Sequence, residues 1–171
     1  WAKSEKLSIA ILGAGSNVLV SDEGVRGLVI QPQFTDITYK EEGDEMLVTV
    51  GAGIILDRLI EELVQNGHWG LENLSAIPGT VGAVPVQNVG AYGVEVKDVI
   101  QTVTVFDIQS EEVRSVTNTE CVFGYRDSIF KHEKRASANK SKMIKSGCSL
   151  FKSSQMDFLK SLTICVLLHS S

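Results

Sequence analysis

Backbone amides on small residues are the first groups in this sequence that could do chemistry. Residues 13–18 read Gly-Ala-Gly-Ser-Asn-Val and follow a short apolar run. A tight turn of this composition exposes several N–H groups beside the hydroxyl of Ser16 and the carboxamide of Asn17. Such a nest holds phosphate oxygens without a cationic side chain. An ordinary turn is the alternative interpretation of the same residues.

Two further glycine-rich segments favour a ligand-binding interpretation. Residues 77–83 and 87–93 place four glycines within seventeen residues. Small residues let the backbone approach a ligand closely, and Pro78 can begin a helical turn whose N-terminal amides face an anion. A flexible surface loop is the alternative. The segment is rich in apolar residues such as Val81 and Val84, which is unusual for an idle solvent loop, so we favour a segment that wraps a ligand.

A tyrosine and an arginine form the third candidate group. Residues 121–131 read Cys-Val-Phe-Gly-Tyr-Arg-Asp-Ser-Ile-Phe-Lys. Arg126 beside Tyr125 is well suited to grip a carboxylate or a diphosphate through paired hydrogen bonds. A surface ion pair of Arg126 with Asp127 or with a glutamate is the alternative, and spacing alone does not separate the two.

Short strands and one helix must position these groups. Between residues 55 and 66 apolar residues recur at three- and four-residue steps, which predicts an amphipathic helix. We expect an ion pair of Arg58 with Glu62 on its wet side and Gly67 as its left-handed cap. Strands are expected at residues 7–12, 18–20, 28–30, 36–39, 46–50, 99–106 and 113–116, with hairpins joining the second to the third, the fourth to the fifth, and the last two. The pattern indicates an α+β fold.

A Rossmann fold is the obvious competitor for a glycine turn after a strand. Val18 stands where the dinucleotide fingerprint has its third glycine. The residues that follow read as strand and hairpin, whereas a Rossmann unit needs a long helix there. We therefore expect an architecture other than Rossmann.

Charge and composition narrow the class of protein. Residues 1–134 carry ten basic and twenty acidic residues, and an acidic body does not attract nucleic acid. We find neither an apolar run that could cross a bilayer nor a secretory signal, so we expect a soluble cytoplasmic protein that does not bind membranes. The three cysteines and three histidines lack ligand-like spacing, which predicts reduced thiols and no metal site.

The last part of the chain differs from the rest. Residues 135–171 hold nine serines and six basic residues against one acidic residue, and their apolar residues show no clear period. A divergent or disordered tail would have this composition. A short helix or strand over residues 158–168 is conceivable, but the pattern shows no partner for it.

Taken in chain order, four motifs closely resemble those of the UDP-N-acetylenolpyruvoylglucosamine reductase family. They span residues 12–19, 70–82, 87–93 and 123–131, and the resemblance as a whole runs from about Ile11 to Glu133. It implies the α+β, two-lobe FAD-binding fold of vanillyl-alcohol oxidase-like flavoproteins. On this basis residues 1–134 would be an FAD-binding domain with an incomplete N-terminal part. Residues 135–171 would stand in place of a substrate-binding domain.

The resemblance also implies a cofactor site. FAD would be bound non-covalently, because the loops contain no cysteine or histidine. By similarity, residues 15–17 and 79–82 would surround the FAD diphosphate, and residues 87–93 would line the rest of the flavin. The implied cofactor-binding residues are Gly13, Gly15, Ser16, Asn17, Pro78, Gly79, Thr80, Val81, Gly82, Gln87, Asn88, Gly90, Ala91, Tyr92 and Gly93.

The reaction implied is a step of peptidoglycan synthesis, and so of cell-wall formation, cell shape and cell division. NADPH would reduce the flavin, and hydride would then pass to the enolpyruvyl group of a UDP-sugar to give UDP-N-acetylmuramate. Arg126 matches the family's catalytic arginine, which stabilises the charge that develops on the substrate carboxylate. Tyr125 matches the tyrosine beside it and would contact substrate. A monomer is expected.

One departure from the family bears on activity. Family members continue with a domain that supplies a serine proton donor and a glutamate, and nothing recognisable as either follows Lys134. Without a positioned acid, turnover would be poor even with FAD bound. A non-catalytic FAD- or nucleotide-binding remnant is therefore the alternative function.

Overall fold

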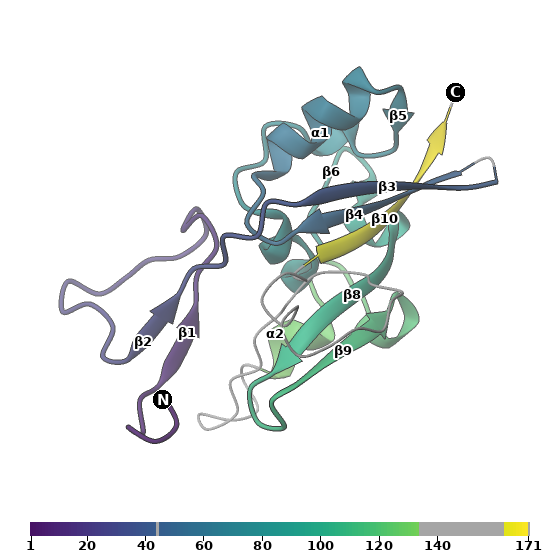
Figure 1. Ribbon diagram of the computed structural model, residues 1–171. Coiled ribbons are helices and arrows are strands. Elements are labelled where there is room, and N and C mark those ends of the chain that lie inside the picture. Colours follow the sequence, from purple (N-terminus) through teal and green to yellow (C-terminus); the bar gives the residue numbers. More distant parts are fainter. Residues whose placement is uncertain (44, 134–162, 171) are drawn as a thin grey trace.

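A six-stranded antiparallel sheet forms the body of the protein. The computed structural model describes residues 1–43, 45–133 and 163–170. The sheet has the order β3-β4-β10-β8-β9, and the two-residue strand β5 also pairs with β10. Its strands are β3 (Ile37–Glu42), β4 (Glu45–Gly51), β5 (His68–Trp69), β8 (Ile100–Asp107), β9 (Glu112–Thr117) and β10 (Thr163–Ser170). Figure 1 shows β10 running between β4 and β8.

Alternating apolar residues explain two of the predicted hairpins. Val48 and Val50 of β4 and Val103 and Val105 of β8 are buried on the core side of the sheet. Strands with a period of two bury one face in this way. β3 pairs antiparallel with β4, and β8 pairs antiparallel with β9. The expected hairpins over residues 36–50 and 99–116 are therefore confirmed.

The predicted amphipathic helix is also present. α1 spans Leu56–Gln65 and buries Leu56, Leu59, Ile60 and Leu63 against the sheet side of the molecule. Gly67 follows the C-cap with φ +78°, as a left-handed cap requires. The expected ion pair of Arg58 with Glu62 is not among those of the described residues. Glu62 instead accepts a 2.6 Å hydrogen bond from the Tyr39 hydroxyl, which fixes α1 to β3.

The N-terminal region corrects another expectation. The expected hairpin of residues 18–20 with residues 28–30 is not formed, because residues 18–20 are not a strand and β2 (Leu28–Ile30) pairs in parallel with β1 (Ile9–Ile11). Parallel strands need a crossover rather than a tight turn. Residues 18–20, expected as a strand, lie in the long connection between β1 and β2, and their apolar side chains are exposed. Figure 1 shows this two-stranded unit to one side of the main sheet.

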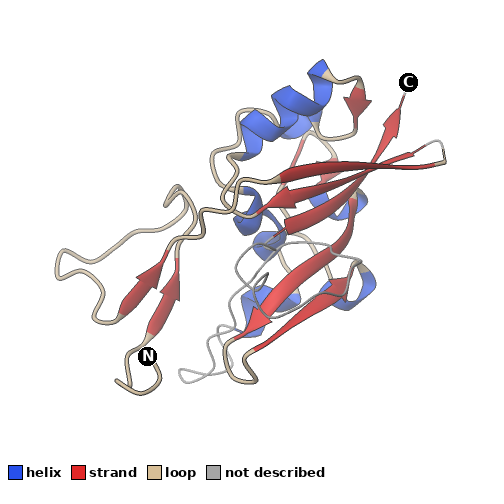
Figure 2. Ribbon diagram, in the orientation of Figure 1, coloured by secondary structure: helices blue, strands red, loops and turns tan. Residues whose placement is uncertain are grey.

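Seven short elements complete the described part of the fold. They include the 3-10 helices η1 (Glu72–Leu74), η2 (Val81–Gln87), η3 (Val96–Asp98) and η4 (Thr119–Cys121), the strands β6 (Gly90–Ala91) and β7 (Val94–Glu95), and helix α2 (Ile129–Glu133). Figure 2 shows the helices gathered on one side of the long strands. The hydrophobic core lies between these two layers and draws residues from α1, η2, β4 and β8.

Part of the segment predicted to be a tail is described and belongs to the sheet. Residues 134–162 and residue 171 lie outside the described residues, and Cys148 is among them. Residues 163–170 form β10, which pairs with β4 and β8 on its two sides. The sequence pattern did not indicate which strands residues 163–170 would pair with. The boundary proposed at residue 134 stays a prediction.

We expect Leu59→Ala to lower the free energy of unfolding by about 2–5 kcal/mol, because it removes a core side chain that is 1% exposed. The matched control is Leu19→Ala, since Leu19 is fully exposed and its loss should change stability by less than about 0.5 kcal/mol. Urea unfolding followed by circular dichroism measures both. Equal effects of the two substitutions would contradict the core as described.

Candidate functional site

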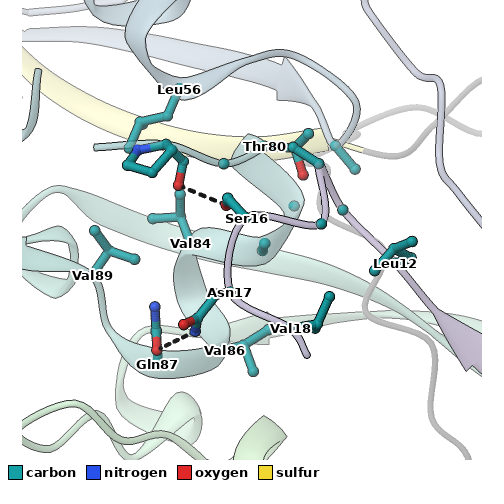
Figure 3. A pocket seen from close by; sticks show the side chains of 18 of the residues that line it. Leu12, Ser16, Asn17, Val18, Leu56, Thr80, Val84, Val86, Gln87 and Val89 are labelled. Atoms are coloured by element: carbon teal, nitrogen blue, oxygen red, sulfur yellow. Dashed lines mark hydrogen bonds between the residues drawn. The ribbon is translucent and has the colours of Figure 1, made fainter. Parts of the chain in front are cut away.

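A cavity of about 290 Å³ lies between the loop of residues 13–18 and the segment of residues 77–89. Its walls are mostly backbone and small or aliphatic side chains (Figure 3). The structure therefore brings the first two glycine-rich stretches together, as the sequence analysis expected. The predicted site residues that line this cavity are Gly13, Gly15, Ser16, Asn17, Pro78, Gly79, Thr80, Gly82 and Gln87.

Side-chain hydrogen bonds join the two sides of the cavity. The Ser16 hydroxyl donates to the carbonyl of Pro78 at 3.1 Å, and the Asn17 carboxamide donates to Gln87 Oε1 at 3.2 Å. Figure 3 shows both bonds reaching across the space between the loop and η2. Ser16 and Asn17 thus fix the loop against the second segment.

The first backbone N–H groups of η2 already donate hydrogen bonds within the protein. η2 begins at Val81, three residues after Pro78, and its first amides are already paired. Val81 N–H donates to Ile54 O at 2.8 Å, and Gly82 N–H donates to Ala52 O at 2.9 Å. These two amides of η2 are therefore not available to an anion, whereas the amides of Gly79 and Thr80, which follow Pro78 directly, donate to no residue that the structure describes.

The loop of residues 13–17 keeps its amides free. Within the described part of the chain, none of these five N–H groups donates a hydrogen bond to another residue. Successive amides in a turn of this kind form an anion-binding concavity. Amides without a partner among the described residues therefore line the cavity from the loop after β1 and from residues 79–80, just before η2.

Two glycines are required by close packing at the cavity. A Cβ atom on Gly13 would lie 2.8 Å from Thr80 Oγ1, and one on Gly82 would lie 2.7 Å from the Cβ of Ala52. Gly15 has φ +78°, a backbone conformation that side-chain-bearing residues rarely adopt. The absence of side chains here lets the loop approach η2 and keeps the cavity open.

All but one of the remaining predicted residues line a second cavity of about 520 Å³. These are Asn88, Gly90, Ala91, Tyr92, Gly93, Tyr125 and Arg126. Glu95 and Lys97 add an ion pair to its wall, and the hydrogen bond from Lys97 holds the pKa of the Glu95 carboxyl below its ordinary value. Val81 lines neither cavity, because its side chain is buried in the hydrophobic core.

A tight turn presents the tyrosine and the arginine. Gly124 and Asp127 exchange two backbone hydrogen bonds of 3.0 and 3.1 Å, which leaves Tyr125 and Arg126 at the tip with exposed side chains. Arg126 adopts φ +52°, in the left-handed region. The Asn88 carboxamide donates to Gly124 O at 2.9 Å, so a residue next to η2 holds the turn in place.

The alternative of an Arg126–Asp127 surface pair is not what the structure shows. Asp127 Oδ2 instead lies 2.5 Å from His132 Nε2. The guanidinium of Arg126 makes no ion pair with any residue that the structure describes. Arg126 therefore keeps its donors available for a ligand in the second cavity.

Lys131 is a cavity residue for which the sequence predicted no role. Lys131 lines the first cavity and is the one charged residue that does so among the described residues. Its Nζ donates to the carbonyl of Arg126 at 2.7 Å. The sequence signal was its place in the motif of residues 121–131, five residues after the arginine.

Cys121 follows a different pattern. Its thiol is fully buried, and desolvation raises its pKa to about 12. A thiol in this state is a poor nucleophile. Cys121 lines neither cavity.

Two searches of the described residues gave no further site. No group of three His, Cys, Asp or Glu side chains is placed to hold a metal ion in this part of the chain. Among the same residues, we find no helix with the length and apolar character needed to span a membrane.

Comparison with known proteins identifies the family of the chain. Residues 1–117 match the family described as FAD binding domain. The chain is 44% identical over 133 residues to the UDP-N-acetylenolpyruvoylglucosamine reductase of Buchnera aphidicola subsp. Baizongia pistaciae, covering 77% of this chain and 40% of that protein. It is 48% identical over 124 residues to the protein of that name from Chromobacterium violaceum, covering 71% and 36%. The chain thus spans about two fifths of the length of these curated relatives.

Solved structures give the same grouping. The UDP-N-acetylenolpyruvylglucosamine reductase of Thermus caldophilus matches 99% of this chain and 50% of its own, with a TM-score of 0.61 and 26% identity. A solvent-stable cholesterol oxidase matches with a TM-score of 0.53 and 15% identity, which shows the fold alone. These matches confirm the expected α+β fold of the vanillyl-alcohol oxidase type.

The Asp127–His132 contact predicts a pH effect on stability. The hydrogen bond from His132 is the main cause that lowers the Asp127 pKa below its ordinary value of 3.8. A depressed folded pKa gives stabilisation that is present above pH 3.8 and is lost as the pH falls through the lowered value. We expect Asp127→Asn to destabilise the protein at pH 7 and to match the parent protein in strong acid.

Urea unfolding at a series of pH values tests this expectation. In a His132→Ala background the same Asp127→Asn substitution should have a much smaller effect at pH 7, because the partner is gone. A difference between the two proteins that stays constant from pH 7 to strong acid would rule out the pair as its cause.

Proposed function

Because the chain belongs to the FAD-binding domain family, we propose that it binds FAD without a covalent bond in the cavity beside residues 13–17. The chain is similar to the FAD-binding portion of the UDP-N-acetylenolpyruvoylglucosamine reductases. The unpaired amides of residues 13–17 would receive the diphosphate. This availability of amides, rather than the presence of glycines as such, is the observation that carries the proposal.

The residues present fit a long dinucleotide. A cavity of 290 Å³ is at the small end of ligand pockets, so it would hold only part of FAD. The segment of residues 86–90 borders both cavities, since Gln87 and Val89 line the first while Asn88 and Gly90 line the second. We infer that an extended ligand follows this segment from one cavity to the other.

The second cavity suits the substrate side of the reaction. When bound, FAD supplies a carrier that takes hydride from NADPH and delivers it to an acceptor. We propose that the acceptor is the enolpyruvyl UDP-sugar, with Arg126 donating hydrogen bonds to its carboxylate. Tyr125, which precedes Arg126 at the tip of the turn, would contact the same molecule. The unpaired guanidinium and the exposed tyrosine side chain support these roles.

Other parts of the proposal rest on composition and resemblance. We propose that NADPH is the electron donor and that the protein acts in the cytoplasm. We also propose that it is a monomer and binds neither nucleic acid nor membranes. No residue of the motifs in residues 12–131 matches the proton donor of the family, so we propose that residues 1–171 by themselves do not supply it. In this proposal these residues bind flavin and turn over substrate slowly. If they have no turnover at all, they are the non-catalytic flavin-binding protein named above as the alternative.

The first test is the binding of FAD itself. We expect the purified protein to quench flavin fluorescence on binding, and Gly13→Val to abolish that binding because the new side chain meets Thr80. Ser16→Ala should weaken binding roughly fivefold, since it removes one hydrogen bond between the loop and residue 78.

Ser21→Ala is the matched control for Ser16→Ala. Ser21 lies in the same connection between β1 and β2 but does not line the cavity. It should leave the FAD dissociation constant unchanged. If the unaltered protein fails to bind FAD, the proposed function is wrong; if Ser21→Ala and Ser16→Ala weaken binding equally, the site is misplaced.

A second test separates the roles of the two cavities. We expect Arg126→Ala to leave FAD binding within about twofold and to weaken binding of the enolpyruvyl UDP-sugar by tenfold or more, because a charge-assisted contact to its carboxylate is lost. Arg114→Ala, which removes an exposed arginine from β9, is the control and should change neither. Isothermal titration of the FAD-loaded protein gives both constants. Loss of FAD in Arg126→Ala would count against a role on the substrate side.

A further inference from the structure

The turn of residues 124–127 depends on contacts from outside itself. Its Arg126 has φ +52°, which is unfavourable for a residue with a side chain. The two backbone bonds between Gly124 and Asp127 close the turn, but they leave the carbonyl of Arg126 without a partner inside it. That carbonyl is held instead by the ammonium group of Lys131 at 2.7 Å.

Both flanks of the turn are fixed to η2 and the residue that follows it. Asn88 Nδ2 donates to Gly124 O at 2.9 Å, and the Ser128 hydroxyl donates to Val86 O at 2.7 Å. Asn88 and Ser128 are each 1% exposed. These two bonds attach the turn to the same segment that forms a wall of the first cavity, so the turn and the cavity share one support.

Lys131 contacts both the first cavity and the turn of residues 124–127. It lines the first cavity, where the other described lining residues are uncharged, and it holds the tip of the turn. A lysine ammonium has three N–H donors. It can therefore keep its bond to the Arg126 carbonyl while a second donor reaches an anionic oxygen in the cavity.

Building on the proposed function, we propose that Lys131 is a positioning residue that couples occupancy of the first cavity by an anionic diphosphate ligand to the order of the turn that carries Tyr125 and Arg126. A bound anion would hold the ammonium at the cavity wall, and the ammonium would then hold the Arg126 carbonyl. Cofactor binding on one side of η2 would in this way prepare the substrate-binding side chains on the other.

Hydrogen exchange measures this coupling without reference to activity. The Gly124 and Asp127 amides close the turn, so peptides that cover residues 122–128 report its order by mass spectrometry. We expect FAD to slow exchange in these peptides at least threefold in the unaltered protein. In Lys131→Met the same saturating FAD should leave exchange unchanged, and Lys131→Arg should restore most of the slowing because it retains a charged donor.

Lys3→Met is the matched control. Lys3 also donates to a backbone carbonyl, that of Gln109 at 3.2 Å, and it lines neither cavity. Its removal changes the net charge equally and should preserve the effect of FAD on the turn. Inorganic diphosphate serves as a second probe, and we expect it to slow exchange in the unaltered protein and not in Lys131→Met.

The outcomes separate the two proposals. If FAD does not bind but diphosphate slows exchange only when Lys131 is present, the proposed function fails and the coupling stands. If FAD binds and slows exchange equally in the unaltered protein and in Lys131→Met, the coupling fails and the proposed function stands. The coupling also fails if neither probe alters exchange in the turn. Should Lys131→Met not fold, the comparison uses Lys131→Gln with the same expected result.

Discussion

The attachment of η2 to the end of β4 is the constraint on which the rest of the site depends. The amides of Val81 and Gly82 donate to carbonyls just beyond β4, and Gly82 packs so closely on Ala52 that a methyl group would not fit. η2 is thereby fixed to the most buried part of the sheet. One side of the helix faces the loop after β1, and its end holds the turn that carries Arg126. Both cavities therefore inherit the rigidity of the core.

The electrostatic character of the site follows from the same arrangement. The first cavity has free amides and one lysine but no acidic residue among its described lining residues, although residues 1–134 carry twice as many acidic as basic residues. Partial positive charges on fixed amides attract an anion without the desolvation cost of several buried lysines. The body of the protein can thus be acidic while the site itself favours an anionic ligand.

Sequence reasoning succeeded where local pattern determines structure. The helix from residue 56 follows from apolar residues at helical steps, and the hairpins over residues 37–51 and 100–117 follow from alternation and polar turns. The gathering of residues 13–17 with residues 78–82 around one cavity agrees with the four ordered motifs. These features depend on neighbours in the chain or on a resemblance that spans them.

The failures have a common physical origin in contacts between distant residues. Residues 28–30 pair in parallel with residues 9–11 rather than in a hairpin with residues 18–20, and no local pattern indicates which of the two partners is used. Whether an amide of η2 is free depends on the carbonyls of Ala52 and Ile54, about thirty residues away. The roles of Val81 as a core residue and of Lys131 as a bridge likewise depend on where the chain returns, which spacing does not reveal.

The position of β10 has a consequence for how the protein comes to be folded. β4 and β8 are each the inner strand of a local hairpin, and β10, the last strand in the chain, lies between them. The two hairpins can form early because their contacts are local, but the sheet is continuous only after residues 163–170 have been synthesised. Until then each hairpin has an open, apolar strand edge of the kind that pairs with other chains. Residues 163–170 therefore do more than extend the sheet, because their pairing covers both of these open edges at once.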